Sequence, residues 1–482
     1  MQPSIDLHAV APEIVLSGTI LLVACVDLFL PKDRKWLSMP LALAGVVATL
    51  IVTLTLVGED RATFGDTFVV NSYALLFKVF FLTVAIAVLL LSLRYFQDGR
   101  YYQGEYYFLL LSAFLGCLIM ASSRDLLLLF LALELVSAPG FLIAAFRKSD
   151  PRSNEAGLKF FLIGVLSSAV MLYGMSLIYG ITGTLQLDRI AAALAGNEQA
   201  IALAGILFVV AGFAFKVSAV PFHFWAPDTY EGSPIPVAAF LSVASKAAGF
   251  AGLLPLMFVA FIHQAEFWAP IFAILAIATM TIGNLVALQQ RQVIRLLAYS
   301  SVAQAGYILI PFAVAGHSAA VDERALASAV LYILIYGVMN LGAFGVVIAM
   351  SREAPGALIS DFAGLIHRAP VLAVAMTGFL VSLAGIPPTA GFWAKFFVIG
   401  AAIERGGIGI VLAAVLVVNS VISLFYYLAV VRQMIFLEGE QKPLRSPFLV
   451  RGVVLAAAVT VFAVGVLPQL FAQFPQGLNL GQ

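Results

Sequence analysis

Fourteen apolar segments, each long enough to cross about 30 Å of hydrocarbon as an α-helix, constrain what this chain can fold into. Hydrophobic residues make up 62% of the 482 residues and charged residues 11%, which excludes an ordinary soluble domain. We therefore expect an all-α polytopic membrane protein with one membrane domain over residues 1–482. The expected spans are residues 11–30, 37–57, 71–93, 106–122, 125–146, 156–180, 199–225, 234–262, 267–288, 293–315, 325–350, 370–403, 408–432 and 448–471.

Composition also excludes several classes of function. A net charge of +1 gives no electrostatic case for binding nucleic acid. Only two cysteines occur, Cys25 and Cys117, and without a CxxC motif they cannot hold an iron–sulfur cluster. Four of the five histidines fall at segment ends without metal-ligand spacing: His8, His263, His317 and His367. We expect no metal and no cofactor on this chain.

The basic residues predict the orientation of the chain. Sixteen Lys and Arg residues lie in the odd-numbered connections between segments and five in the even-numbered ones. Because basic loops stay in the cytoplasm, both termini should face outward. No basic region precedes the first apolar segment, where Asp6 and Glu13 lie instead, so we expect no cleavable signal peptide.

The stretch 213–250 is the most informative part of the chain. It places Lys216 and Lys246 in otherwise apolar runs, separated by a polar turn at 228–233 and four prolines: Pro221, Pro227, Pro234 and Pro236. A lysine at this depth is costly unless it faces a partner or water, and proline breaks a membrane helix only beside protein or water. A buried base beside a broken helix indicates an ion path.

Three further lysines lie within apolar segments. Lys395 follows a second proline break and is a functional candidate like Lys216 and Lys246. Lys78 is close to the outer end of its segment, where snorkelling to the interface explains it. Lys159 lies one turn into its segment, and its position favours neither a functional nor a structural role.

Glu134 is the carboxylate deepest inside an apolar run, about 13 Å from Asp125 along a helix. A buried carboxylate stays charged only beside a cation, so one of the lysines is its natural partner. His223 lies two turns from Lys216, where it can relay protons or cap a helix end. Other polar residues can hold water or pack between helices: Tyr299, Ser300, Ser301, Gln304, Tyr336, Asn340 and Asn419.

The two proline breaks suggest internal symmetry. KVSAVPFHFW in the seventh segment and SLAGIPPTAGFWAKFF in the twelfth each combine proline, tryptophan and lysine. The segments are five apart and therefore run in opposite directions. We expect two inverted five-helix repeats, residues 106–262 (helices 4–8) and 267–432 (helices 9–13), with broken helices 7 and 12.

Several motifs carry a family resemblance that covers essentially the whole chain. LALELVSAPG, EAGLKFF, FKVSAVPFHFWAPDTYEGSPIPVAAFLSVASKAAGF, RQVIRLLAYSSVAQAGYILI, YGVMNLGAF and SLAGIPPTAGFWAKFF closely resemble subunit N of bacterial NADH–quinone oxidoreductase, respiratory complex I. Sister antiporter-like subunits and cation/proton antiporters share the lysine and proline pattern. LALEL…EAGLKFF and the lack of a long C-terminal extension favour subunit N.

The resemblance implies a proton-translocating subunit of this translocase. Glu134 corresponds to a glutamate that pairs with the helix 7 lysine, which is Lys216. Lys246 corresponds to the central lysine of helix 8, Lys395 to the lysine near the exit, and Lys159 to the helix 6 lysine. Protons would pass from Lys216 through Lys246 to Lys395 and outward. The subunit would bind no redox centre and would be driven by quinone reduction elsewhere in the complex.

The resemblance also implies a location and partners. The chain would be a multi-pass protein of the bacterial inner membrane with both termini periplasmic, beside neighbouring antiporter-like and small membrane subunits. One rival is a subunit of a multi-subunit cation/proton antiporter, and another is a membrane scaffold with structural lysines. Peripheral flavin and iron–sulfur subunits that co-purify in mild detergent would identify the oxidoreductase.

The basic-residue count generates a test of orientation. We expect a cysteine introduced at Ser149 to be cytoplasmic and one at Gly196 to be external. A membrane-impermeant thiol reagent on intact cells should therefore label position 196 and spare position 149. The reverse pattern would overturn the orientation.

Overall fold

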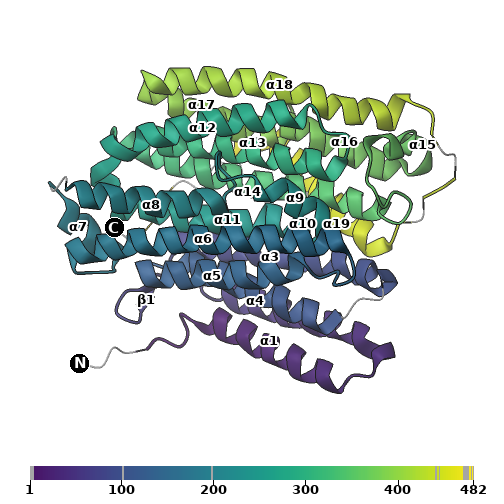
Figure 1. Ribbon diagram of the computed structural model, residues 1–482, viewed down its shortest axis with the longest axis horizontal. Coiled ribbons are helices and arrows are strands. Elements are labelled where there is room, and N and C mark those ends of the chain that lie inside the picture. The colour runs from purple at the N-terminus through teal and green to yellow at the C-terminus, as the bar shows by residue number, and fades with distance from the viewer. Residues whose placement is uncertain are drawn as a thin grey trace. The chain divides into compact units, whose positions relative to one another are not determined.

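The computed structural model describes residues 5–99, 103–196, 199–439, 442–444, 446–469, 477–478 and 480, and almost all regular structure in them is helical (Figure 1). Twelve helical stretches of this part of the chain are long and apolar enough to cross a membrane. The all-α polytopic class is therefore confirmed. The count of fourteen stays a prediction, and two shorter apolar helices lie in the segments expected to be broken.

The chain divides into two compact units. The first comprises Met1–Lys216, Gly232–Ala265 and Leu478–Gln482, and the second comprises Val217–Glu231 and Glu266–Gly477. The chain thus leaves the first unit directly after Lys216 and returns at Gly232. The change of unit at Ala265 falls between the two expected repeats, whose inverted relation stays a prediction.

Ten α-helices and a hairpin make up most of the described part of the first unit. The helices are α1 (Ala11–Phe29), α2 (Ser38–Leu54), α3 (Ser72–Gly99), α4 (Gln103–Ser122), α5 (Leu126–Ala144), α6 (Pro151–Thr182), α7 (Leu187–Leu194), α8 (Ala200–Lys216), α10 (Ile235–Phe240) and α11 (Lys246–Pro255), and the hairpin is β1 (Arg61–Thr63) with β2 (Phe68–Val70). The long pairs α6 with α8 and α4 with α5 pack side by side (Figure 1).

Local sequence sets where these helices begin and end. The Asp125 carboxylate accepts hydrogen bonds from the Leu127 and Leu128 amides and so caps α5. Asp150 caps α6 in the same way. That helix ends at Gly183, whose φ of 66° is a left-handed conformation that suits glycine. The short helix α7 lies between α6 and α8 in the chain and buries its apolar stripe of Leu187, Ile190 and Leu194.

The second unit holds the remaining helices. They are α9 (Trp225–Gly232), α12 (Ala265–Ala287), α13 (Val293–Val314), α14 (Ala319–Met350), α15 (Leu365–Arg368), α16 (Pro370–Ala384), α17 (Ala390–Arg405), α18 (Ile408–Phe436) and α19 (Phe448–Val466). Helix α14 packs against α16, α17 and α19. The segment expected at 370–403 is broken between α16 and α17, and the last two residues of the span expected at 448–471 lie outside the described residues.

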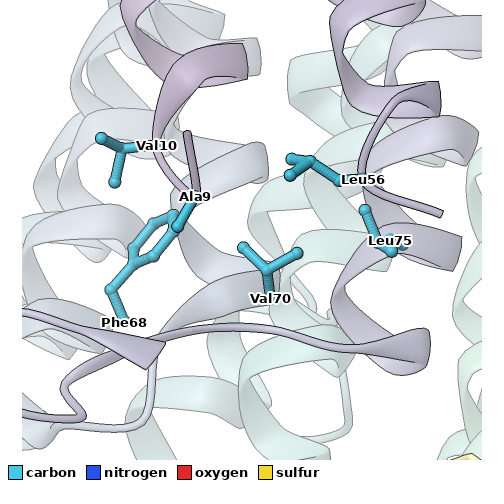
Figure 2. Close-up of a cluster of buried hydrophobic side chains, with 6 residues drawn as sticks. All are labelled: Ala9, Val10, Leu56, Phe68, Val70 and Leu75. Atoms are coloured by element: carbon cyan, nitrogen blue, oxygen red, sulfur yellow. The ribbon is translucent and has the colours of Figure 1, made fainter. Parts of the chain in front are cut away.

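A small apolar cluster packs the N-terminal segments against the hairpin (Figure 2). Its buried members are Ala9, Val10, Leu56, Phe68, Val70 and Leu75. The Phe68 ring also lies 4.8 Å from the Lys78 ammonium, measured to the ring centroid. The cluster therefore borders a buried cation on α3.

The snorkelling interpretation of Lys78 is wrong. Its side chain is 0% exposed, and its Nζ lies 2.8 Å from Glu13 Oε1 on α1. Glu13 is also buried, with 8% of the residue exposed. Sequence position placed both residues near segment ends, but helix packing brings the opposite charges together inside the protein.

This buried pair should control the stability of the N-terminal helices. Lys78→Met leaves Glu13 without its cation, and we expect a loss of about 3 kcal/mol, because removing one partner strands the other charge. The double variant Glu13→Gln/Lys78→Met should recover most of that loss. Thermal denaturation of the purified protein measures both effects. Lys148→Met is the matched control, because its pair with Glu105 is 69% and 56% exposed; equal losses for Lys78→Met and the control would refute the assignment.

Candidate functional site

Lys216 is the last residue of α8 and is 2% exposed. The helix stops here because Ser218 has a φ of 60° and Pro221 lacks an amide donor. The Lys216 ammonium donates a hydrogen bond of 2.8 Å to Ser137 Oγ on α5. The helix break thus leaves a buried base at its end, with a neutral hydroxyl as its partner.

Glu134 does not pair directly with Lys216. It lies one turn before Ser137 on α5 and accepts a hydrogen bond from Ser168 Oγ on α6. Lys78 and Lys159 form their ion pairs with other carboxylates, Glu13 and Glu155. Ser137 therefore lies where the expected carboxylate contact would be, and the sequence alone gave no reason to select it.

Lys246 begins α11 in the interior of the first unit and is 2% exposed. A π-helical turn, Leu241–Ser245, directly precedes it. Such wide turns are rare and occur often at functional sites. Helices α3, α4, α5 and α8 surround the segment α10–α11. The expected central lysine therefore lies at an irregular point of a fully buried helix.

Lys159 lies outside this buried group. Its ammonium pairs with Glu155, four residues earlier on α6, at 2.7 Å, and its side chain is 43% exposed. This i,i+4 pair is an ordinary feature of a helix surface. The Lys159 side chain is therefore partly exposed, whereas Lys216 is buried.

Lys395 lies on α17, just after the second break, and is 5% exposed. Its ammonium donates to the Ala384 carbonyl at 2.8 Å and to Ser420 Oγ at 3.0 Å. The Tyr307 ring lies 4.7 Å away, measured to its centroid. Gly385 ends α16 with a φ of 91°, and a Cβ there would approach Lys395 Cδ to 2.9 Å. The break therefore needs glycine both for its backbone conformation and for the lysine beside it.

A polar network runs behind Lys395 through the second unit. Asn284 Nδ2 donates to Tyr307 Oη at 2.9 Å, and Tyr426 Oη donates to Asn284 Oδ1 at 2.9 Å. Tyr332 Oη donates to Gln304 Oε1 at 2.6 Å. Further members are Ser300 with Tyr427, Asn419 with Asn284, and Asn340 with Tyr336. Of the polar residues singled out in the sequence, Ser301 is buried and Tyr299 is half-buried.

His223 lies in the turn between α8 and α9 and is 4% exposed. Within the described structure its Nδ1 has no hydrogen-bond partner. The adjoining helix α9 is fixed to α13, because Arg295 pairs with Asp228 at 2.9 Å and with Glu231 at 2.6 Å. His223 is thus a buried imidazole in a turn next to α9, which the Arg295 ion pairs anchor to α13. Its expected relay role stays a prediction.

The described residues contain no group of three or more His, Cys, Asp or Glu side chains that could hold a metal ion. Cys25 is exposed and Cys117 is buried, and both are free. The expectation that the chain binds no cofactor stays a prediction. Several contact residues were missed in the sequence: Ser137, Ser168, Asn284, Tyr307, Tyr332, Ser420, Tyr426 and Tyr427. In the sequence these residues stand out only as polar side chains within apolar segments. That pattern does not indicate which residues they contact.

Residues 123–423 match the transmembrane family described as NADH:quinone oxidoreductase/Mrp antiporter. NADH-quinone oxidoreductase subunit N of Trichlorobacter lovleyi is 39% identical over 481 residues, covering 98% of this chain and 97% of the relative. Subunit N 2 of Rhizobium meliloti is 41% identical, covering 98% of each. A chain of respiratory complex I from Thermus thermophilus matches with a TM-score of 0.81 and 31% identity, covering 96% of this chain and 98% of that one. A chain of the Mrp complex from a Dietzia species shares the fold, with a TM-score of 0.83 at 21% identity over 98% and 97% of the two chains.

The position of Glu134 generates a test of its charge. We expect Glu134→Gln to assemble normally and to lower ion translocation, because it removes the charge and nearly preserves the shape that Ser168 contacts. Glu134→Asp should be milder, since the carboxylate survives one methylene shorter. Translocation in vesicles with equal amounts of assembled complex measures the difference. Equal performance of the Gln and Asp variants would show that the charge is not required.

Proposed function

Because the chain belongs to the subunit N family of the NADH-quinone oxidoreductases, we propose that its buried lysines carry protons across the membrane. The chain is a membrane subunit of that enzyme complex and carries out no redox chemistry itself. Quinone reduction elsewhere in the complex would drive protons from the cytoplasm to the outside. The subunit would lie in the bacterial inner membrane with both termini periplasmic, beside antiporter-like and small membrane subunits.

One observation supports this proposal above the others. Lys216 and Lys395 are buried, and among the described residues their ammonium groups meet only neutral acceptors: Ser137, the Ala384 carbonyl and Ser420. Burial disfavours a charged amine, and hydrogen bonds to it favour the charge. These two effects compete at Lys216 and Lys395, and no carboxylate forms an ion pair with either ammonium among the described residues. A small change in the charge of a neighbouring group is then enough to make the lysine gain or lose a proton.

The proposed path has one part in each unit. In the first unit, Glu134 and Ser137 lie on the same face of α5, and through this face Glu134 acts on Lys216. Lys246 then receives the proton from Lys216. In the second, Lys395 receives it and releases it outward. His223 would serve the cytoplasmic end. Lys159 has the weakest support, because its pair with Glu155 lies on a half-exposed surface.

A subunit of a cation/proton antiporter remains the rival function. Its support is the shared fold with the Mrp chain, whereas the relatives that match over nearly the whole length are subunit N proteins. Purification in mild detergent separates the two. We expect peripheral flavin and iron–sulfur subunits to accompany this chain.

The decisive test of the relay is at Lys395. Arginine keeps a positive charge but does not release its proton, so it separates a relay from a fixed charge. We expect Lys395→Arg and Lys395→Ala to assemble and to lower proton translocation to a similar extent, by about tenfold or more. Dye-monitored proton uptake by inverted vesicles measures this, with Lys148→Arg as an exposed control. If Lys395→Arg translocates protons at the parent rate while Lys395→Ala does not, Lys395 is a structural charge and not a relay.

A further inference from the structure

Lys395 lies in a cage without a carboxylate. Its contacts are a backbone carbonyl, the Ser420 hydroxyl and the face of the Tyr307 ring. Within the described residues no acidic side chain lies at ion-pair distance from it, although other lysines have such partners, as Lys78 has Glu13. Some other feature must favour a cation at this position when a proton arrives.

We propose that Tyr307 is the positioning residue that holds protonated Lys395, through the face of its ring. This inference rests on the proposed proton relay. A separation of 4.7 Å between ammonium and ring centroid is within the range of a cation–π contact. The negative face of the ring attracts an ammonium ion and has little attraction for a neutral amine. Tyr307 therefore distinguishes the loaded lysine from the unloaded one.

The ring is held in place from its other end. Tyr307 is fully buried, and its hydroxyl accepts a hydrogen bond from Asn284 Nδ2 at 2.9 Å. The same Asn284 accepts from Tyr426 Oη, so its amide is itself oriented. Gly306 lets α13 approach α12 closely, because a Cβ there would lie 2.6 Å from the Met280 amide nitrogen. These contacts fix the ring face toward Lys395.

This arrangement has a consequence for release. A carboxylate partner would hold the loaded lysine through a full opposite charge, whereas the quadrupole of a ring acts weakly and only at short range. Lys395 can therefore be stabilised while loaded and still leave its cage when the charge around it changes. We assign to Tyr307 the role of a weak holder, suited to a residue that must also let its proton go.

The test uses variants that change the ring face and little else. We expect Tyr307→Phe to retain most proton translocation, because the ring face remains although the hydroxyl contact with Asn284 is lost. Tyr307→Leu should lower it by roughly threefold to thirtyfold. Phenylalanine analogues with one, two and three ring fluorines at position 307 withdraw charge from the face at nearly constant size. Translocation should fall stepwise along that series.

Tyr106 provides the matched control. It is a fully buried tyrosine whose hydroxyl is hydrogen-bonded to Ser92 at 2.8 Å, and it lies in the first unit on α4. The same fluorinated series at position 106 should leave translocation unchanged. A flat series at position 307, or a Tyr307→Leu variant that pumps at the parent rate, would overturn the inference.

The outcomes at Tyr307 and Lys395 are separable. A flat fluorine series together with equally crippled Lys395→Arg and Lys395→Ala variants would leave the relay intact and remove Tyr307 from it. Full pumping by Lys395→Arg would instead refute the relay at this position. Because the fluorinated analogues are nearly isosteric, the comparison holds even where the leucine variant fails to assemble.

Discussion

Every backbone amide and carbonyl inside a membrane must find a hydrogen-bond partner within the protein, and this structure depends on that constraint. Unbroken helices such as α14 satisfy it by themselves. The two breaks do not, and each places a buried lysine where backbone groups are freed. At the second break, Lys395 takes the Ala384 carbonyl that α16 no longer uses. At the first, the Val220 amide donates to Thr279 Oγ1 at 3.0 Å. The breaks supply the polar contacts beside the lysines that are proposed to carry protons.

In the proposed relay, the partner of a buried lysine, and not its burial, separates structural from functional roles. Lys78 is the most deeply buried of the five, and its ammonium faces the Glu13 carboxylate. Lys216 and Lys395 face hydroxyl, carbonyl and ring groups, which leave their charge adjustable. A buried ion pair resists change because either charge alone is costly. Neutral cages suit a site that must change its protonation state in each cycle.

Hydroxyl groups connect the carboxylate of α5 to its surroundings. Ser168 on α6 donates a hydrogen bond to Glu134 on α5. One turn after Glu134 on α5, Ser137 accepts a hydrogen bond from Lys216. A charge on Glu134 therefore reaches Lys216 through space and through oriented dipoles, without a direct bond that would lock the two together.

The sequence by itself determined the membrane class, the approximate positions of most segments and the two helix breaks, and it singled out the lysines that the relay proposal uses. These follow from hydropathy, proline and glycine, which act locally along the chain. Only the tertiary structure decided which side chains meet. It paired Lys78 with Glu13, hydrogen-bonded Lys216 to Ser137 and placed the Tyr307 ring against Lys395. Sequence reasoning missed these contacts because they join helices that are far apart in the chain. An apolar segment carries almost no periodicity to show which face it turns inward, so its partners emerge only when the helices pack.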